Sequence, residues 1–419
     1  MLAEGLRCLR CDARYEPGAM FAGCPACAGR GTPSNLSVVY DDDALAKAVH
    51  DRPREPGSLW RYRDLLPVAP QDVTTLGEGG TPLVPAPRLA AKLGLKELYL
   101  KDESRNPTGS FKDRLAAVAV SVARGMGMRV ITGSSSGNAG AATAAFAARA
   151  GLPCVMLTTQ QFPIAMKTQM AVFGTLLLAA PTVKDRWRIV GQAVERLDWF
   201  PVTVYTWPYF GSNCYGIEGY KTIGYEIVDQ LGRAPDHVVV PVGAGDAFTG
   251  AWKGFCEFRR AGVIDTVPRM HAAEVYGPLE HALAEGLDDC IEMPIGPDPT
   301  VAVSVGSNLS TFQALNVLRD TGGAARSADN AAMLQAQRDL AALEGIYVET
   351  SSALSVATIP RLVETGAVDP AGTVVAVLTS TGLKHSELTA AHLPSIPECG
   401  ADLDSALDVL HSSYGFTAP

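Results

Sequence analysis

Two units of the sequence each run from an apolar segment through a loop of small residues into a helix-forming segment. The first unit spans residues 129–150 and the second begins at residue 237. Each begins with a predicted strand, and the continuous apolar run at 237–242 indicates a strand that is covered on its two faces. Because strands and helices alternate along the chain, the sequence predicts a doubly wound α/β fold. Such folds bind ligands at the carboxyl ends of their strands, which is where both loops lie.

The same patterns predict the remaining elements. Apolar runs predict strands at 96–100, 153–158, 176–179, 346–349 and 373–379. Helical periodicity predicts helices at 167–173, 186–197, 217–231, 301–314, 330–343 and 403–410.

The two loops are candidate anion-binding sites. They read Gly133-Ser134-Ser135-Ser136-Gly137-Asn138 and Gly243-Ala244-Gly245-Asp246-Ala247. The first N–H groups of a helix have no partner within the helix, so such loops suit a carboxylate or a phosphate. The alternative for the first loop is an ordinary serine-rich turn. In the second loop, Asp246 would repel a phosphate unless its side chain turns away.

Lys112 is a candidate nucleophile. Ser110 and Asp113 have the spacing of a capping box, which predicts a helix that begins near Phe111 and carries Lys112 in its first turn. The helix dipole disfavours a cation at that end, so the neutral amine that attacks carbonyl groups is favoured. The alternative is a solvent-exposed lysine without a chemical role.

Four cysteines near the N-terminus have the spacing of a metal site. Cys8 and Cys11 form one Cys-x-x-Cys pair, and Cys24 and Cys27 form another. Two such pairs predict a tetrahedral zinc site. Four thiolates leave no open position, which favours a structural zinc over a catalytic or DNA-reading one. The five other cysteines of the chain are scattered and are interpreted as packing residues.

The composition limits the classes of partner. A net charge of −9 argues against nucleic acids and acidic membrane surfaces. No apolar run reaches the length of a membrane span, and the first residues lack a secretory apolar segment. We therefore predict a cytoplasmic protein.

The segment from Asn106 to Arg114, Asn-Pro-Thr-Gly-Ser-Phe-Lys-Asp-Arg, resembles the signature around the cofactor-bearing lysine of fold-type II pyridoxal phosphate enzymes. The resemblance is closest to the threonine synthase-like family and covers roughly residues 6–390. Other motifs of that family occur in its order, namely the cysteine pairs, Gly79-Gly80-Thr81-Pro82, Ser136-Gly137-Asn138, Glu218-Gly219-Tyr220-Lys221-Thr222 and Thr379.

The resemblance implies two doubly wound α/β domains and an N-terminal zinc-ribbon-like segment. Residues 1–40 would form that segment, and residues 41–125 together with 205–395 would form the large cofactor-binding domain. Residues 126–204 would form the small domain, and 396–419 a C-terminal tail. A homodimer is expected from the resemblance alone.

The resemblance also implies roles for single residues. Lys112 would carry pyridoxal phosphate as a Schiff base and shuttle the Cα proton, Asn138 would bind the phenolic oxygen of the ring, and Thr379 would face the pyridine nitrogen. The cofactor phosphate would be bound by Gly243, Ala244, Gly245, Asp246 and Ala247. The carboxylate of an amino-acid substrate would be bound by Ser135, Ser136, Gly137, Asn138 and Ala139. A neutral hydroxyl opposite the ring nitrogen suits elimination and replacement over transamination.

The chain departs from the family where the substrate phosphate is expected. Threonine synthases usually carry an Asn-Ser pair and an arginine before the Glu-Gly motif, and those places correspond here to Phe210, Gly211 and Gly216. Glycine cannot replace an arginine–phosphate pair. The sequence therefore favours elimination or replacement on another amino acid with a leaving group.

Several alternatives stay open at this point. The chain could be a true threonine synthase that acts on O-phosphohomoserine, or a threonine or serine dehydratase. It could also be a zinc-ribbon binding protein on an inactive enzyme scaffold. A more distant alternative is a ribokinase-like sugar kinase, because Gly243-Ala244-Gly245-Asp246 resembles the signature of that family.

Overall fold

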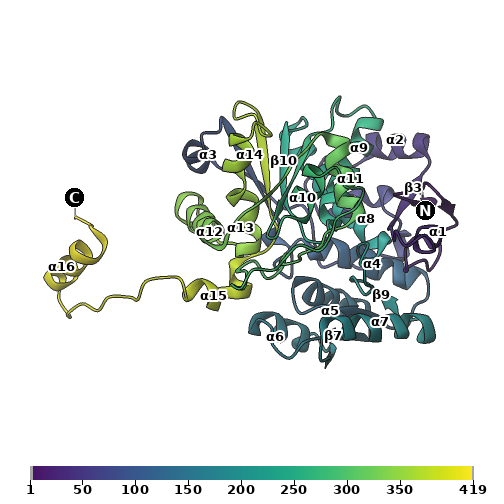
Figure 1. Ribbon diagram of the computed structural model, residues 1–419, viewed down its shortest axis with the longest axis horizontal. Coiled ribbons are helices and arrows are strands. Elements are labelled where there is room, and N and C mark those ends of the chain that lie inside the picture. The colour runs from purple at the N-terminus through teal and green to yellow at the C-terminus, as the bar shows by residue number, and fades with distance from the viewer. Residues whose placement is uncertain (1–2, 418–419) are drawn as a thin grey trace. The chain divides into compact units, whose positions relative to one another are not determined.

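The structure is a computed structural model that describes residues 3–417 (Figure 1). It consists of two compact units, one ending at Lys384 and the other beginning at His385. The second unit contains the helices α15 (Ser386–Ala390) and α16 (Leu403–Tyr414). Among the described helices, none combines the length and the apolar character that a membrane crossing requires.

The first unit is built around a six-stranded sheet with the strand order β12-β11-β10-β13-β5-β4. All neighbouring strands are parallel except the edge strand β4, which is antiparallel to β5. The strands are β4 (Leu83–Pro85), β5 (Glu97–Asp102), β10 (His237–Pro241), β11 (Arg269–Glu274), β12 (Ala325–Ser327) and β13 (Thr373–Leu378). Every residue of β10 and β13 is buried, as expected for central parallel strands.

Helices cover both faces of this sheet (Figure 1). One side carries α3 (Pro87–Leu93), α12 (Asn330–Glu344), α13 (Thr350–Ala357) and α14 (Ile359–Glu364). The other side carries α8 (Cys214–Leu231), α9 (Asp246–Arg260), α10 (Pro278–Ala284) and α11 (Phe312–Thr321). The fold is therefore a doubly wound α/β fold, as the sequence predicts.

A second, fully parallel sheet has the order β8-β7-β6-β9. Its strands are β6 (Ile131–Ser134), β7 (Cys154–Thr158), β8 (Leu176–Ala179) and β9 (Phe200–Pro201). The helices between them are α5 (Asn138–Ala150), α6 (Ile164–Val172) and α7 (Val183–Leu197).

The helix α4 (Lys112–Gly125) packs against both α5 and α8. Gly219 of α8 allows close approach, because a Cβ there would lie 2.0 Å from the carbonyl oxygen of Arg114. The guanidinium of Arg114 is fully buried and forms ion pairs of 2.7 Å with both Glu103 and Glu226. Paired in this way, the buried charge fixes the segment before α4 onto α8.

The N-terminal segment forms a small antiparallel sheet of the order β2-β1-β3. Its elements are β1 (Ala3–Cys8), β2 (Arg14–Tyr15), α1 (Pro25–Ala28) and β3 (Leu36–Tyr40), and α2 (Asp42–Asp51) follows.

Two predicted elements are wrong. Residues 301–311 form no helix, and α11 begins only at Phe312. The expected strand 346–349 is reduced to a single bridge of Val348 with Thr381, and α13 follows directly. In both places hydroxyl and carboxyl side chains bond to distant segments, for example Ser304 to Glu349 at 2.9 Å. These tertiary contacts override the local pattern.

Candidate functional site

The segment before α4 is held against the end of β13. The N–H of Phe111 donates to the carbonyl oxygen of Thr379 at 2.9 Å, and the N–H of Thr381 donates to that of Gly109 at 3.0 Å. Gly109 has a φ of +80°, and a Cβ there would lie 2.9 Å from a methyl carbon of Thr381. Glycine is therefore required at this position. The contacts fix Lys112, the first residue of α4, beside the end of the strand.

The capping box predicted for this helix does not form. The cap position is taken by Phe111, which makes no side-chain cap bond. The carboxylate of Asp113 instead accepts bonds from the N–H and the hydroxyl of Thr108, at 2.7 and 2.5 Å. The hydroxyl of Ser110 has no partner among the residues that the structure describes. The turn is thus held from Thr108 rather than from Ser110.

Lys112 lies beside aromatic rings. Its ammonium is 4.6 Å from the ring centre of Phe111 and 5.6 Å from that of Tyr220, and the two rings stack. Within residues 3–417, Lys112 forms no hydrogen bond or ion pair. Desolvation lowers the pKa of its ammonium, while the carboxylate of Asp246 acts in the opposite direction. Desolvation therefore shifts the equilibrium of this group toward the neutral amine.

Asn138 begins α5 and is held by two residues that the sequence did not point to. Its amide nitrogen donates to Glu349 at 3.1 Å, and its amide oxygen accepts from the ammonium of Lys384 at 2.8 Å. Ser380 donates to the same carboxylate at 3.0 Å. Burial lowers the pKa of Lys384 to about 8, although Asp113 and Glu349 act to raise it. The site thus contains a second amine, which is buried.

The loop before α5 presents free N–H groups. The hydroxyl of Ser135 accepts from the N–H groups of Gly137 and Gly140 at 3.2 and 3.0 Å. The N–H groups of Ser136, Asn138 and Ala139 have no acceptor among the described residues. The hydroxyl of Ser136 is bonded to Thr158 at 2.9 Å and to Arg186 at 2.7 Å. This loop is suited to a small anion.

The loop before α9 is shaped in a similar way. The carbonyl oxygens of Gly243 and Ala244 accept from the hydroxyls of Ser310 and Thr311 at 2.8 and 2.7 Å. Within the described chain, none of the N–H groups from residue 243 to 247 has an acceptor. Gly245 has a φ of +83°, which favours glycine. With its carbonyl groups engaged, the loop leaves its N–H groups for an anion.

Asp246 does not stand free in this loop. Its carboxylate accepts from the N–H and the hydroxyl of Ser212 at 3.1 and 2.7 Å, and from the amide of Gln313 at 2.7 Å. Both carboxylate oxygens are therefore engaged by neighbouring residues. A phosphate in this loop requires that the side chain of Asp246 turn away from it, and these bonds hold the side chain in that way.

Thr379 follows β13 and is buried. Its hydroxyl is 2.8 Å from the hydroxyl of Ser352, which also accepts from the N–H of Ser380 at 2.8 Å. Ser352 belongs to α13, a helix that was not predicted, so sequence reasoning missed this neighbour.

The structure explains two glycines that depart from the family pattern. Gly211 has a φ of +128°, and a Cβ there would lie 2.8 Å from a carboxylate oxygen of Asp246. A Cβ on Gly216 would lie 3.1 Å from both Leu115 and Ala119 of α4. Both positions are therefore packing positions, and a side chain on Gly216 would meet α4.

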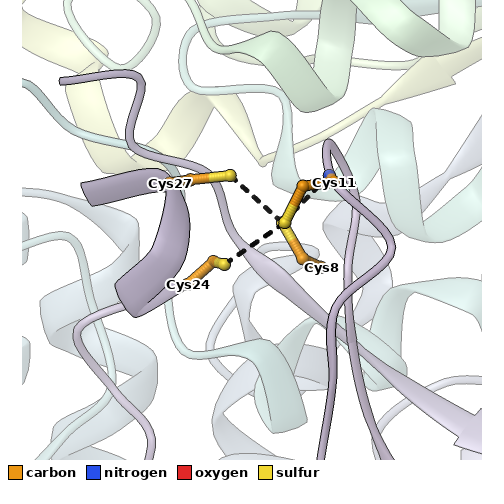
Figure 2. Close-up of side chains that lie close together, drawn as sticks. All are labelled: Cys8, Cys11, Cys24 and Cys27. Atoms are coloured by element: carbon orange, nitrogen blue, oxygen red, sulfur yellow. Dashed lines mark hydrogen bonds between the residues drawn. The ribbon is translucent and has the colours of Figure 1, made fainter. Parts of the chain in front are cut away.

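The four N-terminal cysteines converge (Figure 2). Cys8 and Cys11 come from the end of β1 and its turn, whereas Cys24 and Cys27 come from the start of α1. All four sulfur atoms lie within 4.8 Å of one another, with 3.6 Å between Cys8 and Cys27 and 3.7 Å between Cys11 and Cys24. Four Zn–S bonds of about 2.3 Å in a tetrahedron place the sulfur atoms about 3.8 Å apart. The sulfur positions therefore fit a zinc ion.

Comparison with known proteins agrees with this arrangement. Residues 74–380 match the family described as pyridoxal-phosphate dependent enzyme. A threonine synthase of Methanosarcina acetivorans is 36% identical over 384 residues, which are 90% of this chain and 92% of the relative. A threonine synthase of Methanocaldococcus jannaschii is 34% identical over 405 residues, or 94% and 96% of the two chains.

Solved structures share the fold. The processed form of threonine deaminase isoform 2 from Solanum lycopersicum superposes with a TM-score of 0.63 at 19% identity. The superposition covers 90% of this chain and 97% of the threonine deaminase chain. The family match gives no support to a sugar kinase, so that interpretation of Gly243 to Asp246 is rejected. The chain belongs to the pyridoxal-phosphate dependent enzymes and, within them, to the threonine synthase-like lyases and synthases.

Proposed function

We propose that this enzyme catalyses elimination or replacement on an amino acid that carries a leaving group, with Lys112 as the residue that holds the cofactor and moves the Cα proton. The observation that carries the proposal is the position of Lys112. Its amine has no hydrogen-bonding or ionic partner among the described residues, and desolvation favours its neutral form. A neutral amine both attacks an aldehyde and accepts a proton.

The residues around Lys112 fit pyridoxal phosphate. The free N–H groups of residues 243–247 would bind its phosphate, Asn138 would bind its phenolic oxygen, and Thr379 would face its ring nitrogen. When bound, this cofactor stabilises negative charge on the substrate Cα. The hydrogen bond from Lys384 to Asn138 would fix the orientation of the amide. The free N–H groups of the loop 135–139 would hold the substrate carboxylate.

The leaving group on the amino acid defines the class of substrate. A second candidate substrate is O-phosphohomoserine, the substrate of true threonine synthase. The threonine synthases among the relatives support it. The places of the usual phosphate-binding residues are nevertheless taken by Phe210, Gly211 and Gly216, and the last of these packs on α4. Release of phosphate, ammonia and 2-oxo acid from phosphohomoserine, phosphoserine, threonine and serine distinguishes synthase, lyase and dehydratase activity.

Replacing Lys112 tests the catalytic part of the proposal. Lys112→Ala is expected to abolish turnover and covalent attachment of the cofactor, because the second amine of the site, that of Lys384, is engaged by Asn138. The variant should still fold, since Lys112 forms no hydrogen bond or ion pair within residues 3–417 and its ammonium is desolvated. Mass spectrometry after borohydride reduction would locate the cofactor on Lys112 in the parent enzyme. Turnover by Lys112→Ala at the parent rate would remove Lys112 from this role.

We also propose that Cys8, Cys11, Cys24 and Cys27 hold a structural zinc ion. The support is the separation of the sulfur atoms, together with the absence of a fifth cysteine, histidine or acidic group in this cluster among the described residues. Elemental analysis of the purified protein is expected to give one zinc per chain. A zinc content near zero in protein prepared without chelators would contradict the proposal.

The remaining expectations from the sequence belong to the same proposal. They are a small domain at 126–204 beside a large cofactor-binding domain, a homodimer, and a cytoplasmic location. Light scattering in solution tests the dimer.

A further inference from the structure

Arg186 is a buried arginine at the start of α7, on the loop side of the second sheet. The residue is only 8% exposed, and a terminal nitrogen of its guanidinium donates to the hydroxyl of Ser136 at 2.7 Å. Ser136 belongs to the loop that presents free N–H groups before α5. Arg186 therefore reaches the place where we propose that the substrate is held.

The charge of Arg186 has no counter-ion within residues 3–417. Among the described residues no carboxylate forms an ion pair with it, and its Nε is buried without any acceptor. Of the five N–H donors of the guanidinium, only one is engaged within residues 3–417, by Ser136. Burial lowers the pKa of this group, and no neighbouring charge opposes the effect.

Arg114 provides the contrast within the same chain. It is more deeply buried, with 0% exposed, but two carboxylates pair with its guanidinium and all its nitrogen atoms are bonded. Burying a guanidinium costs desolvation free energy, which two carboxylates offset at Arg114 and no carboxylate among the described residues offsets at Arg186. The missing counter-ion at Arg186 is therefore the feature that requires an explanation, and an anionic ligand supplies one.

The carboxylate common to all amino acids does not need this group. The N–H groups of Ser136, Asn138 and Ala139 and the dipole of α5 already provide donors for one anion. A guanidinium beside them offers a planar pair of donors that matches a phosphate or a second carboxylate.

We propose that Arg186 binds a second anionic group, carried on the side chain of the substrate, and so supplies the guanidinium that the chain lacks at Gly216. The inference rests on the proposed function, in that the loop 135–139 holds the substrate carboxylate. It assigns the enzyme to substrates with a phosphate or carboxylate on the side chain, rather than to threonine or serine.

The test compares Arg186→Met with the parent holoenzyme on two pairs of substrates. The charged pair is O-phosphohomoserine and O-phosphoserine, and the neutral pair is threonine and serine. For the charged pair, kcat/KM is expected to fall on the order of 10- to 100-fold, mainly through KM, because charged hydrogen bonds are lost. For the neutral pair it should change less than about threefold. Arg186→Lys should recover part of the loss, since it keeps the charge but not the planar fork.

Controls separate this role from folding. Arg188→Met removes an exposed arginine of the same helix that pairs with Asp185, and should leave all four substrates unaffected. Arg186→Met should melt no lower than the parent, because it removes an unpaired buried charge. An equal loss on charged and neutral substrates would overturn the proposal, since Arg186 would then act on the common carboxylate or on the fold. Unchanged kinetics on the charged pair would overturn it as well.

Calorimetric binding of O-phosphoserine and of serine to the holoenzyme gives a second measurement that does not depend on turnover. If the enzyme turns over none of the four compounds, the proposed function fails, but preferential binding of O-phosphoserine that is lost in Arg186→Met still supports the role of Arg186. Equal binding of the two ligands, or equal binding by parent and variant, would refute it.

Discussion

Lys384 makes the stability of this enzyme depend on pH in a direction that the structure defines. Lys384 is 4% exposed, its ammonium donates to the amide oxygen of Asn138 at 2.8 Å, and burial lowers the pKa of this ammonium from 10.5 to about 8. In the unfolded chain the pKa returns to about 10.4. The folded state therefore disfavours the charged form, and Lys384→Met removes this penalty.

The sign follows from the two pKa values. Below pH 8 the amine is charged in both states, so the folded enzyme carries the full penalty, about 3 kcal/mol for a shift of some 2.5 pH units. Between pH 8 and about 10.4 the folded amine is neutral while the unfolded amine keeps its proton, so the stability of the parent rises with pH. The stability of Lys384→Met relative to the parent should therefore fall by about 2–3 kcal/mol from pH 7 to pH 10.

Urea unfolding of parent and variant at several pH values measures this difference. The lost hydrogen bond to Asn138 adds a constant offset of about 1 kcal/mol, which does not alter the slope. Lys167→Met, at an exposed position, is the matched control and should show no such slope. A difference between parent and Lys384→Met that stays constant from pH 7 to pH 10 would refute the reasoning.

Three other substitutions test separate parts of the structure. Cys24→Ser should abolish zinc binding and lower the melting temperature, whereas Cys399→Ser at an exposed site should do neither; elemental analysis and calorimetry measure both. Gly216→Arg should lower the free energy of unfolding by roughly 1–3 kcal/mol, because the new side chain overpacks against α4, and it should not improve phosphate recognition. Turnover of phosphohomoserine without loss of stability would contradict our explanation of this glycine. Asp246→Asn should lower the pKa of Lys112 further, because the carboxylate that acts to raise it is removed; the pH dependence of cofactor attachment reports this shift, and an upward shift would be inconsistent with it.

The sequence predicted those parts of the site that are local in the chain. The start of α4 at Lys112, the loop before Asn138 and the glycine loop before α9 are each recognisable from a strand, small residues and a helix in succession. The capping box failed although its spacing was correct, because Asp113 found stronger partners in Thr108. Spacing shows which bonds are available, but competing donors decide which bond forms.

The residues that were missed enter the site from distant segments. Glu349 was assigned to a strand, and Lys384 lies beyond the last predicted strand, yet both meet Asn138. Arg186 was predicted only as the beginning of a helix. No local sequence pattern distinguishes a buried charged residue that binds a ligand from a charged residue on the surface. Only the packed structure shows that, within residues 3–417, no carboxylate pairs with Arg186 while two pair with Arg114.

The same packing links the cysteine cluster to the proposed cofactor loop. Asn35, which precedes β3, donates to the carbonyl oxygen of Ser212 at 3.1 Å, and the hydroxyl of Ser212 donates to Asp246 at 2.7 Å. Cys24 is anchored nearby, because its N–H donates to the carbonyl oxygen of Ser34 at 2.9 Å. A continuous set of bonds therefore runs from a proposed zinc ligand to the carboxylate that acts on Lys112. A structural zinc ion at one end would hold Asp246 in place at the other, so the N-terminal segment contributes to the electrostatics of Lys112 without contacting it.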